Sequence, residues 1–419
     1  MGHKLLSFIG TRRYTESYYS YNGKRSNRPY QFIQEAIVEF FCRNWKEDDQ
    51  LIVFMTEESR RKNWLSKKGC EDANFDEGLK IKLEKLKNSL GINFKIEEIE
   101  IPEGKSEEEL WTIFERMNEV LSDDDVVILD VTHSFRYLPM FGLIVLNYVK
   151  FLKDVKLERI IYGAMEALGT ADEVKKMDLD SRIIPIFDLT PFARLFDWTI
   201  AIERFLQTGN AEIMREIAIE ELKPLLAETR GEVGGGIRRL VNSLGKFSRD
   251  VLTCRSPEFR RNVEAISEAI LEAEKELENL RPFRPLFSKI KERFSKMAKH
   301  DGVISGLEEA RWCLEKGLIQ QGLTVLRETI VNYVISEVLK KKDFRSRTYR
   351  EIAEVMLNSE YEEIPDEILR LWSEIREYRN DINHAGWNTQ NYHSSNKFEG
   401  KLEEFIERGM RIMDISKSS

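Results

Sequence analysis

Two side chains near the C-terminus, Arg379 and His384, have the types needed for cleavage of RNA without a metal. Such cleavage needs a base that takes the proton of the 2′-hydroxyl and a cation that holds the phosphate while negative charge builds on its oxygens. Histidine titrates near neutral pH, and arginine is permanently charged and matches phosphate geometry. The expected products are a 2′,3′-cyclic phosphate and a 5′-hydroxyl.

The apolar positions between Ile368 and Ile375 predict a helix that runs into this pair. On a regular helix, residues five apart lie roughly 140° apart around the axis, so one copy of Arg379 and His384 converges poorly on a phosphate. A second copy from a two-fold-related chain would complete the site, which predicts a homodimer. Asn380 and two further short polar residues lie between them, which is unusual inside a helix. On spacing alone, two unrelated surface side chains remain the alternative.

Two polar loops that follow predicted strands form a second group of candidates. In open parallel sheets, ligands bind beyond the carboxyl ends of the strands. Backbone amides at the start of a helix, hydroxyl groups and a guanidinium can all bind phosphate or ribose groups. The alternative for the second loop is that its polar residues only cap the following helix and that its histidine is packed inside the protein. The candidates are Gly10, Thr11 and Arg12 in the first loop, and Thr132, His133, Ser134 and Arg136 in the second.

The first 190 residues alternate strand-like and helix-like segments, which predicts a Rossmann-like α/β domain with a mostly parallel sheet and helices on both faces. The segment 138–152 is apolar nearly all round, so we expect a well-buried helix there. The residues between the first strand and Pro29 read as a polar, Tyr-rich loop. The expected strands are Leu5–Ile9, Leu51–Met55, Phe94–Ile101, Asp125–Val131, Arg159–Tyr162 and Ile183–Phe187.

Residues 191–419 have helical periodicity almost throughout, which predicts an all-α second domain. The break between Arg281 and Pro285 reads as a turn. The charged stretch Lys340–Arg350 reads as a solvated loop, with guidance of RNA as the alternative. The expected helices are Phe192–Gln207, Glu212–Glu228, Ile237–Val251, Pro257–Leu280, Val303–Lys316 and Ile319–Lys340.

The composition of the 419-residue chain is that of a globular protein, with 42% hydrophobic and 33% charged residues. A net charge of −8 argues against a protein that coats long nucleic acid, but leaves room for a local RNA site. The four cysteines and five histidines lack metal-ligand spacing, so neither a metal nor another cofactor is expected. No apolar run reaches membrane-spanning length, and the cytoplasm is the expected location.

Several of these segments resemble a known family. The segment from Arg379 to His384 is similar to the Arg-x-x-x-x-His motif of HEPN ribonucleases, with Asn380 as its adjacent polar residue. The segments 8–11, 130–136 and 162–167 resemble signatures of CRISPR-associated Rossmann-fold (CARF) sensors. Together they resemble the CARF–HEPN accessory ribonucleases of type III CRISPR systems, over essentially the whole chain.

The resemblance implies that a cyclic oligoadenylate binds across the sensor domains of a homodimer, which could assemble further, and activates cleavage of single-stranded RNA. It places Arg379, His384 and Asn380 at the catalytic positions, and the two polar loops at the ligand. The alternatives are a cyclic-oligoadenylate-binding regulator, or an enzyme that only opens the ring of its activator. Because a ligand activates only through a higher affinity for the active state, the family's mechanism requires two conformations.

Overall fold

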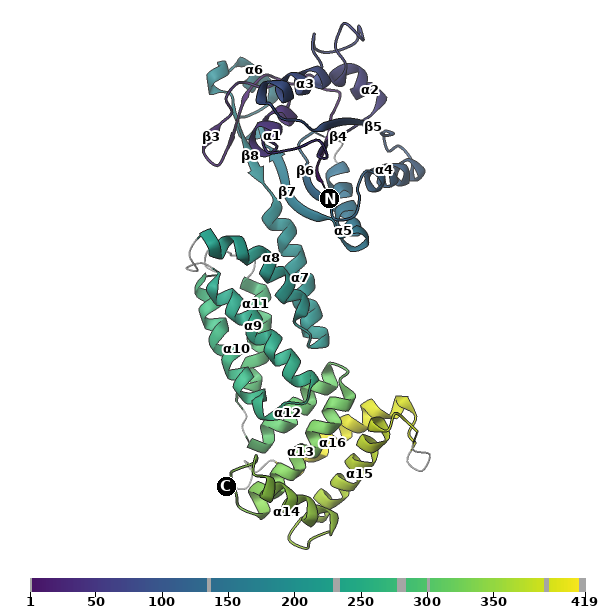
Figure 1. Ribbon diagram of the computed structural model, residues 1–419, viewed down its shortest axis with the longest axis vertical. Helices are drawn as coiled ribbons and strands as arrows, with labels where there is room; N and C mark the ends of the chain where they lie inside the picture. The colour runs from purple at the N-terminus through teal and green to yellow at the C-terminus, as the bar shows by residue number, and fades with distance from the viewer. Residues whose placement is uncertain are drawn as a thin grey trace. The chain divides into compact units, whose positions relative to one another are not determined.

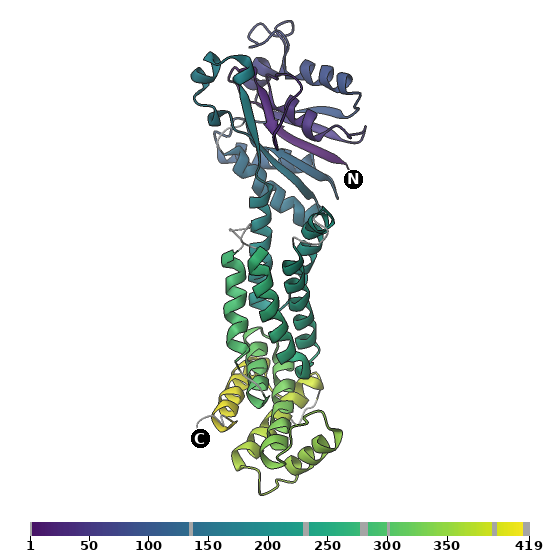
Figure 2. The same cartoon turned by 90° about the vertical axis from the view of Figure 1, so that its left-hand side faces the viewer.

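The computed structural model describes residues 2–133, 137–228, 234–276, 284–299, 302–387 and 392–413, without the side chains of 221–228 and 276. The chain divides into two compact units, Met1–Arg194 and Leu195–Ser419. The first contains a β-sheet with helices, and the second is helical (Figure 1 and Figure 2).

Within the described residues, eight strands of the first unit form one sheet in the order β3-β2-β8-β7-β6-β1-β4-β5. The strands β5, β4, β1, β6 and β7 run parallel, as the sequence predicts. Each central strand is a run of apolar residues because both of its faces are covered. Their bounds are β1 His3–Phe8, β2 Tyr18–Tyr21, β3 Lys24–Arg25, β4 Gln50–Met55, β5 Lys95–Glu100, β6 Val126–Asp130, β7 Lys156–Gly163 and β8 Ile183–Asp188.

Helices cover both faces of the sheet. Side chains of α1 (Ile33–Phe41) and α3 (Leu79–Leu90) share one hydrophobic core with one face, and those of α4 (Glu107–Glu119) and α5 (Leu138–Lys153) share a second core with the other. Short helical turns complete the unit: α2 Glu57–Ser59, η1 Arg60–Trp64, η2 Met165–Ala167, α6 Ala171–Lys176 and η3 Leu179–Ser181. The layered α/β architecture is the predicted one.

The sheet is more mixed than expected. Strand β8 pairs antiparallel with β7, and β2 and β3 extend the sheet beyond β8. The interpretation of residues 18–25 as loop is therefore wrong. Because β2 finds its partner β8 more than 160 residues later in the chain, no local pattern marked it.

The expected burial of α5 is also wrong. One face of the helix, including Val145 and Val149, packs on the sheet. The opposite face leaves six large apolar side chains exposed, with Phe151 at 87%. These residues are Met140, Leu143, Ile144, Tyr148, Phe151 and Leu152, which we call the α5 apolar face. An apolar stripe of this kind is typical of a surface that a partner covers.

The second unit is built on two hydrophobic cores. One joins helices α7 to α11 with part of α12, and the other joins α12 to α16. The helices α11, α14 and α16 were not predicted. Pro285 was interpreted as part of a turn, but it lies in the first turn of α11, where proline is tolerated. The helix α14 begins inside the charged stretch that was interpreted as a loop. The bounds are α7 Thr190–Thr208, α8 Glu212–Glu228, α9 Gly235–Leu252, α10 Ser256–Glu276, α11 Arg284–Met297, α12 Gly302–Glu315, α13 Ile319–Tyr333, η5 Val334–Val338, α14 Arg347–Asn358, α15 Asp366–Asn383, η6 Ser395–Lys397 and α16 Phe398–Met413.

The contact between α12 and α13 yields a stability prediction. A Cβ at Gly306 would overlap the Oγ1 atom of the buried Thr329, whereas a Cβ at Gly400 in α16 would meet no atom within 4 Å. We expect Gly306→Ala to lower the free energy of unfolding by about 1–3 kcal/mol through overpacking. Gly400→Ala, the matched control, should raise it by about 0.5–1 kcal/mol. Urea denaturation measures both, and equal effects would contradict the packing of these helices.

Candidate functional site

A buried hydrogen-bond network fixes the ends of two central strands. Asp130, the last residue of β6, is completely buried and accepts a hydrogen bond from the Ser7 hydroxyl at 2.6 Å and from the Thr132 N–H at 2.9 Å. Gln34 in α1 donates to the Ser7 hydroxyl and to the Phe8 carbonyl, each at 2.9 Å. Burial raises the pKa of Asp130, and these bonds oppose the shift. The network therefore ties the loop after β6 to β1.

The loop after β1 is held by hydrogen bonds from two side-chain amides. The side chain of Asn63, buried in η1, donates to the carbonyls of Gly10 at 2.7 Å and Arg12 at 2.8 Å. Asn74 donates to the Asn63 amide oxygen at 2.8 Å, and the Gly10 N–H donates to the Tyr14 hydroxyl at 2.8 Å. The carbonyls of Gly10 and Arg12 thus each have a hydrogen-bond partner, which holds the loop in one conformation.

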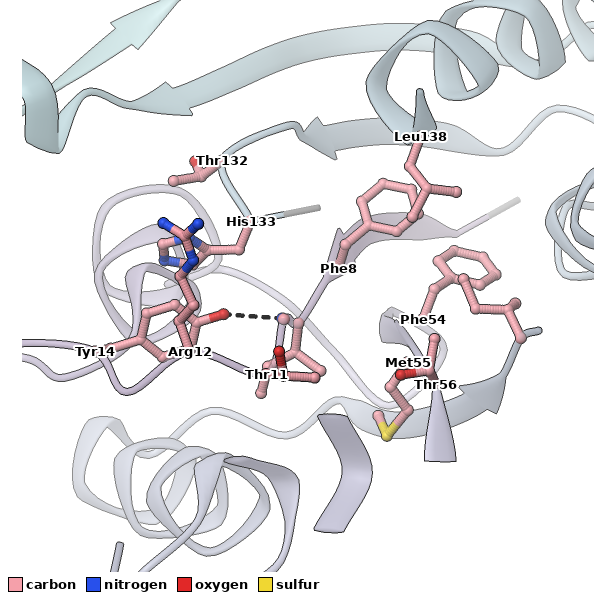
Figure 3. A pocket seen from close by; sticks show the side chains of 13 residues that line it. Phe8, Thr11, Arg12, Tyr14, Phe54, Met55, Thr56, Thr132, His133 and Leu138 are labelled. Carbon is pink, nitrogen blue, oxygen red and sulfur yellow. Dashed lines mark hydrogen bonds between the residues drawn. The ribbon is translucent and has the colours of Figure 1, made fainter. Parts of the chain in front are cut away.

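These two loops line one pocket of about 520 Å³ at the carboxyl ends of the strands (Figure 3). The predicted ligand residues at its wall are Gly10, Thr11, Arg12, Thr132 and His133. The other two, Ser134 and Arg136, lie outside the described residues. Apolar side chains of β1, β4 and the start of α5 form much of the remaining wall. A concave, largely apolar pocket with a few convergent polar groups is typical of a small-molecule site.

His133 and Arg12, which both line the pocket, differ in their charge. The ring of His133 stacks on Tyr14 with centroids 4.2 Å apart, and burial lowers the pKa of His133 to about 4. His133 is therefore neutral at pH 7 and offers a ring face and one N–H, whereas Arg12 supplies positive charge. The Thr132 hydroxyl accepts from the Gly163 N–H at 2.8 Å, which fixes its rotamer.

The second group of candidates lies at the C-terminal end of α15. The helix ends at Asn383, so His384 occupies the C-cap position and does not continue the helix as the sequence suggested. The Gly386 N–H donates to the Asp381 carbonyl and the Ala385 N–H to the Ile382 carbonyl, each at 3.1 Å, which is a Schellman motif. Ala385 adopts a left-handed φ of 52°, so the chain turns sharply after His384.

Arg379 and His384 differ in their surroundings. Arg379 is half-buried, and the amide oxygen of Asn383, when it faces the guanidinium, lies 2.9 Å from Nε. His384 is exposed, and its N–H donates to the Asn380 carbonyl at 2.9 Å. Asn380 is half-buried. No hydrogen bond joins Arg379 to His384 in the part of the chain that the structure describes, so one copy does not assemble the pair by direct contact.

A second histidine at this helix end was not singled out from the sequence. Asp381 is 1% exposed and accepts hydrogen bonds from the backbone N–H of His393 at 2.7 Å and from its ring, with Nδ1 at 3.2 Å. The His393 ring stacks on Tyr378 at 3.9 Å, and its Nε2 lies 3.2 Å from Glu377. His393 thus lies against α15 and holds its own part of the chain there.

Neither His393 nor Asn63 carried a sequence signal, because each acts on residues that lie elsewhere in the chain. Asn63 bonds to residues more than 50 positions earlier, and no spacing rule identifies such pairs. Among the described residues, no three His, Cys, Asp or Glu side chains are grouped to hold a metal ion. Within the same residues, no helix combines the length and apolar character that crossing a membrane requires.

Comparison with known proteins assigns two segments. Residues 4–166 match the family described as the CARF domain of the CRISPR system endoribonuclease Csx1, and residues 194–302 match the second domain of the CRISPR-associated protein MJ1674. The chain is 29% identical over 126 residues to CRISPR-associated protein MJ1674 of Methanocaldococcus jannaschii. That alignment covers 29% of this chain and 18% of the relative. These matches support a CRISPR-associated protein with a CARF domain, and both family matches end before Arg379.

The pocket predicts a pH dependence of stability. Because the folded-state pKa of His133 lies near 4, below the ordinary 6.5, the unfolded chain takes up the proton first. The stability that the neutral ring contributes is present above pH 6.5 and is lost as the pH falls toward 4. We expect Tm to fall less between pH 6.5 and 4.5 in His133→Asn than in the unmutated protein. His3→Asn, at a half-buried ring outside the pocket, is the control, and equal slopes for all three proteins would contradict the burial of His133.

Proposed function

We propose that this protein is a ribonuclease switched by a ligand: a cyclic oligoadenylate binds the first unit and activates metal-independent cleavage of single-stranded RNA by Arg379, His384 and Asn380. The observation that carries the proposal is the single pocket formed by both predicted loops, inside the segment that matches a CARF domain. A CRISPR-associated protein with such a domain is suited to sense cyclic oligoadenylate during defence.

The chemistry of the pocket fits an adenylate. The guanidinium of Arg12 can bind phosphate in a bidentate manner, and the hydroxyls of Thr11 and Thr132 can bond to phosphate or ribose. The absence of a Cβ at Gly10 lets a ligand approach the backbone closely. The neutral, stacked His133 offers a ring face to a base without adding charge.

The α5 apolar face supports a homodimer. Its six exposed side chains lie at helical spacing on one side of α5, and α5 begins at the pocket, where Leu138 forms part of the wall. Covering this face with a second copy would remove a large apolar area from water at about 25 cal/mol per Å². A two-fold interface at α5 would bring two pockets together, which suits a ring-shaped ligand.

At the helical site, we infer a division of work between the two side chains. His384 is exposed at a helix end and can take the proton of a 2′-hydroxyl, whose oxygen then attacks the phosphorus. Arg379, steadied by Asn383, can hold the charge on the phosphate oxygens while the 5′-oxygen leaves and takes a proton. Because no hydrogen bond joins the pair within the described part of one chain, symmetry-related copies or the bound RNA would bring the groups together.

The alternative is a cyclic-oligoadenylate-binding protein without this ribonuclease, acting as a regulator or as a ring-opening enzyme. Its support is that the matched segments contain the pocket but neither Arg379 nor His384.

A cleavage assay separates these functions. Labelled single-stranded RNA is incubated with chelator and each cyclic oligoadenylate, using the unmutated protein, His384→Ala and Arg379→Ala. We expect one ring size to stimulate cleavage strongly, and each substitution to reduce the rate by about 10² or more while activator binding persists. The control is His3→Ala. Cleavage that survives His384→Ala would refute the catalytic assignment, and activator binding without any cleavage would favour the alternative.

Disruption of the α5 apolar face tests the dimer. Ile144→Glu would place a charge in the proposed interface, where its desolvation opposes association. We expect the unmutated protein to sediment as a dimer and Ile144→Glu as a monomer that responds weakly to activator. Val355→Glu, which changes an exposed apolar residue of α14, is the matched control and should leave the dimer intact. An unmutated protein that is monomeric with and without activator would rule out this role of α5.

A further inference from the structure

Two exposed aromatic side chains lie beside the turn that follows His384, and the proposed function does not use them. Trp387 is 87% exposed and Tyr392 is 65% exposed. Covering an aromatic ring of this kind removes about 150–250 Å² of surface from water, so each ring is a strong contact for a bound molecule. A ligand that reaches His384 would pass two uncovered rings.

The position of Trp387 is set by the end of α15. Its N–H donates to the His384 carbonyl at 3.0 Å, directly after the bonds of the Schellman motif that ends the helix. Gly386 has a φ of 72°, a left-handed conformation that glycine adopts without strain. The backbone of Trp387 is therefore held within one tight turn of His384.

Tyr392 is held near the same turn by its neighbour in the chain. His393 is anchored to α15 by its hydrogen bond and its ring contact there. The Tyr392 ring lies against Gly386, because a Cβ built on that glycine would be 3.5 Å from the Cε2 atom of the ring. Both exposed aromatic rings thus belong to residues at the same end of α15 as His384.

The residues around the two rings are small or polar, which distinguishes this surface from the α5 apolar face. The exposed residues next to them in the chain are Asn383, His384, Ala385, Ser394, Ser395 and Asn396. A protein partner is favoured by a contiguous apolar patch, as on α5. The bases of a single nucleic-acid strand, in contrast, stack one by one on separate rings. The two rings therefore fit RNA better than a second protein.

We propose that Trp387 and Tyr392 stack on unpaired bases of an RNA strand whose phosphate lies at Arg379 and His384. The guanidinium of Arg379 supplies the positive charge that a phosphate beside these bases requires. Stacking on an aromatic ring contributes about 1–3 kcal/mol per base and accepts every base. In a duplex the bases are stacked on one another, so the two rings select single strands.

The same contacts would position the strand for cleavage. A nucleotide whose base stacks on the protein is released from its neighbour in the strand, which lets its 2′-oxygen align with the phosphorus opposite the leaving 5′-oxygen. The inference rests on the proposed function in this respect, since it takes His384 as the group that meets the 2′-hydroxyl. Binding of the strand by the two rings does not depend on that step.

Equilibrium binding of RNA to the full chain tests the proposal. The probes are fluorescein-labelled 2′-O-methyl oligonucleotides, as single strands and as duplexes, which cannot be cleaved because the 2′-oxygen carries no proton. Fluorescence anisotropy is measured with and without each cyclic oligoadenylate. We expect Trp387→Ala and Tyr392→Ala each to weaken binding of the single strand about tenfold, and to leave binding of the duplex unchanged.

Two further variants serve as controls. Trp387→Phe keeps an aromatic ring and should retain most of the affinity. Tyr361→Ala removes another exposed tyrosine of the same unit, which precedes α15 and is separated from His384 by the length of that helix, about 27 Å. It should bind RNA like the unmutated protein. Because Trp387 and Tyr392 are exposed, their variants should also keep the Tm of the unmutated protein.

Cleavage and sedimentation of the same variants separate this inference from the proposed ribonuclease. If both alanine variants bind and cleave RNA like the unmutated protein, the inference is overturned and the ribonuclease stands. If both bind the single strand more weakly but no protein cleaves RNA, the RNA site stands and the ribonuclease fails. The inference is also overturned if no single strand binds at about 0.1 mM. A change in sedimentation of Trp387→Ala with unchanged RNA affinity would identify a protein interface instead.

Discussion

The carboxylate of Asp130 is buried at the carboxyl end of β6, and the hydrogen bonds that it accepts determine the shape of the neighbouring pocket. A buried carboxylate is costly unless hydrogen-bond donors surround it. Here the donors are the Ser7 hydroxyl and the Thr132 N–H, and Gln34 orients Ser7 in turn. The loop after β6 is therefore held against the end of β1, and Thr132 faces the same space as the loop that starts at Gly10.

Two other features cost free energy in the isolated chain, and a bound partner or ligand could offset such a cost. The α5 apolar face exposes large apolar side chains to water, and one oxygen of the buried Glu309 has no hydrogen-bond partner among the described residues. Evolved proteins tolerate such local costs where a partner or a ligand compensates them. A second copy of the chain would compensate the first of these costs.

The helix end at α15 shows how backbone geometry can change an interpretation made from spacing. Arg379 and His384 are five residues apart, which on a regular helix would separate them around the axis. The Schellman motif and the left-handed Ala385 instead end the helix before His384, so its direction depends on the turn. His393 bonds to Asp381, in the last turn of the helix, through its backbone N–H.

The sequence by itself determined the alternation of strands and helices in the first 190 residues, the parallel core strands, most of the helices that follow and the two loops of the pocket. The strands and helices follow from apolar periodicity among neighbouring residues, and the two loops follow from polar residue types at the ends of predicted strands. Only the tertiary structure decided that β2 joins the sheet through β8, that α5 keeps an apolar face exposed, that Asn63 shapes the first loop and that Glu309 is buried. Each of these depends on contacts between residues far apart in the chain, and local periodicity contains no information about which distant residues meet.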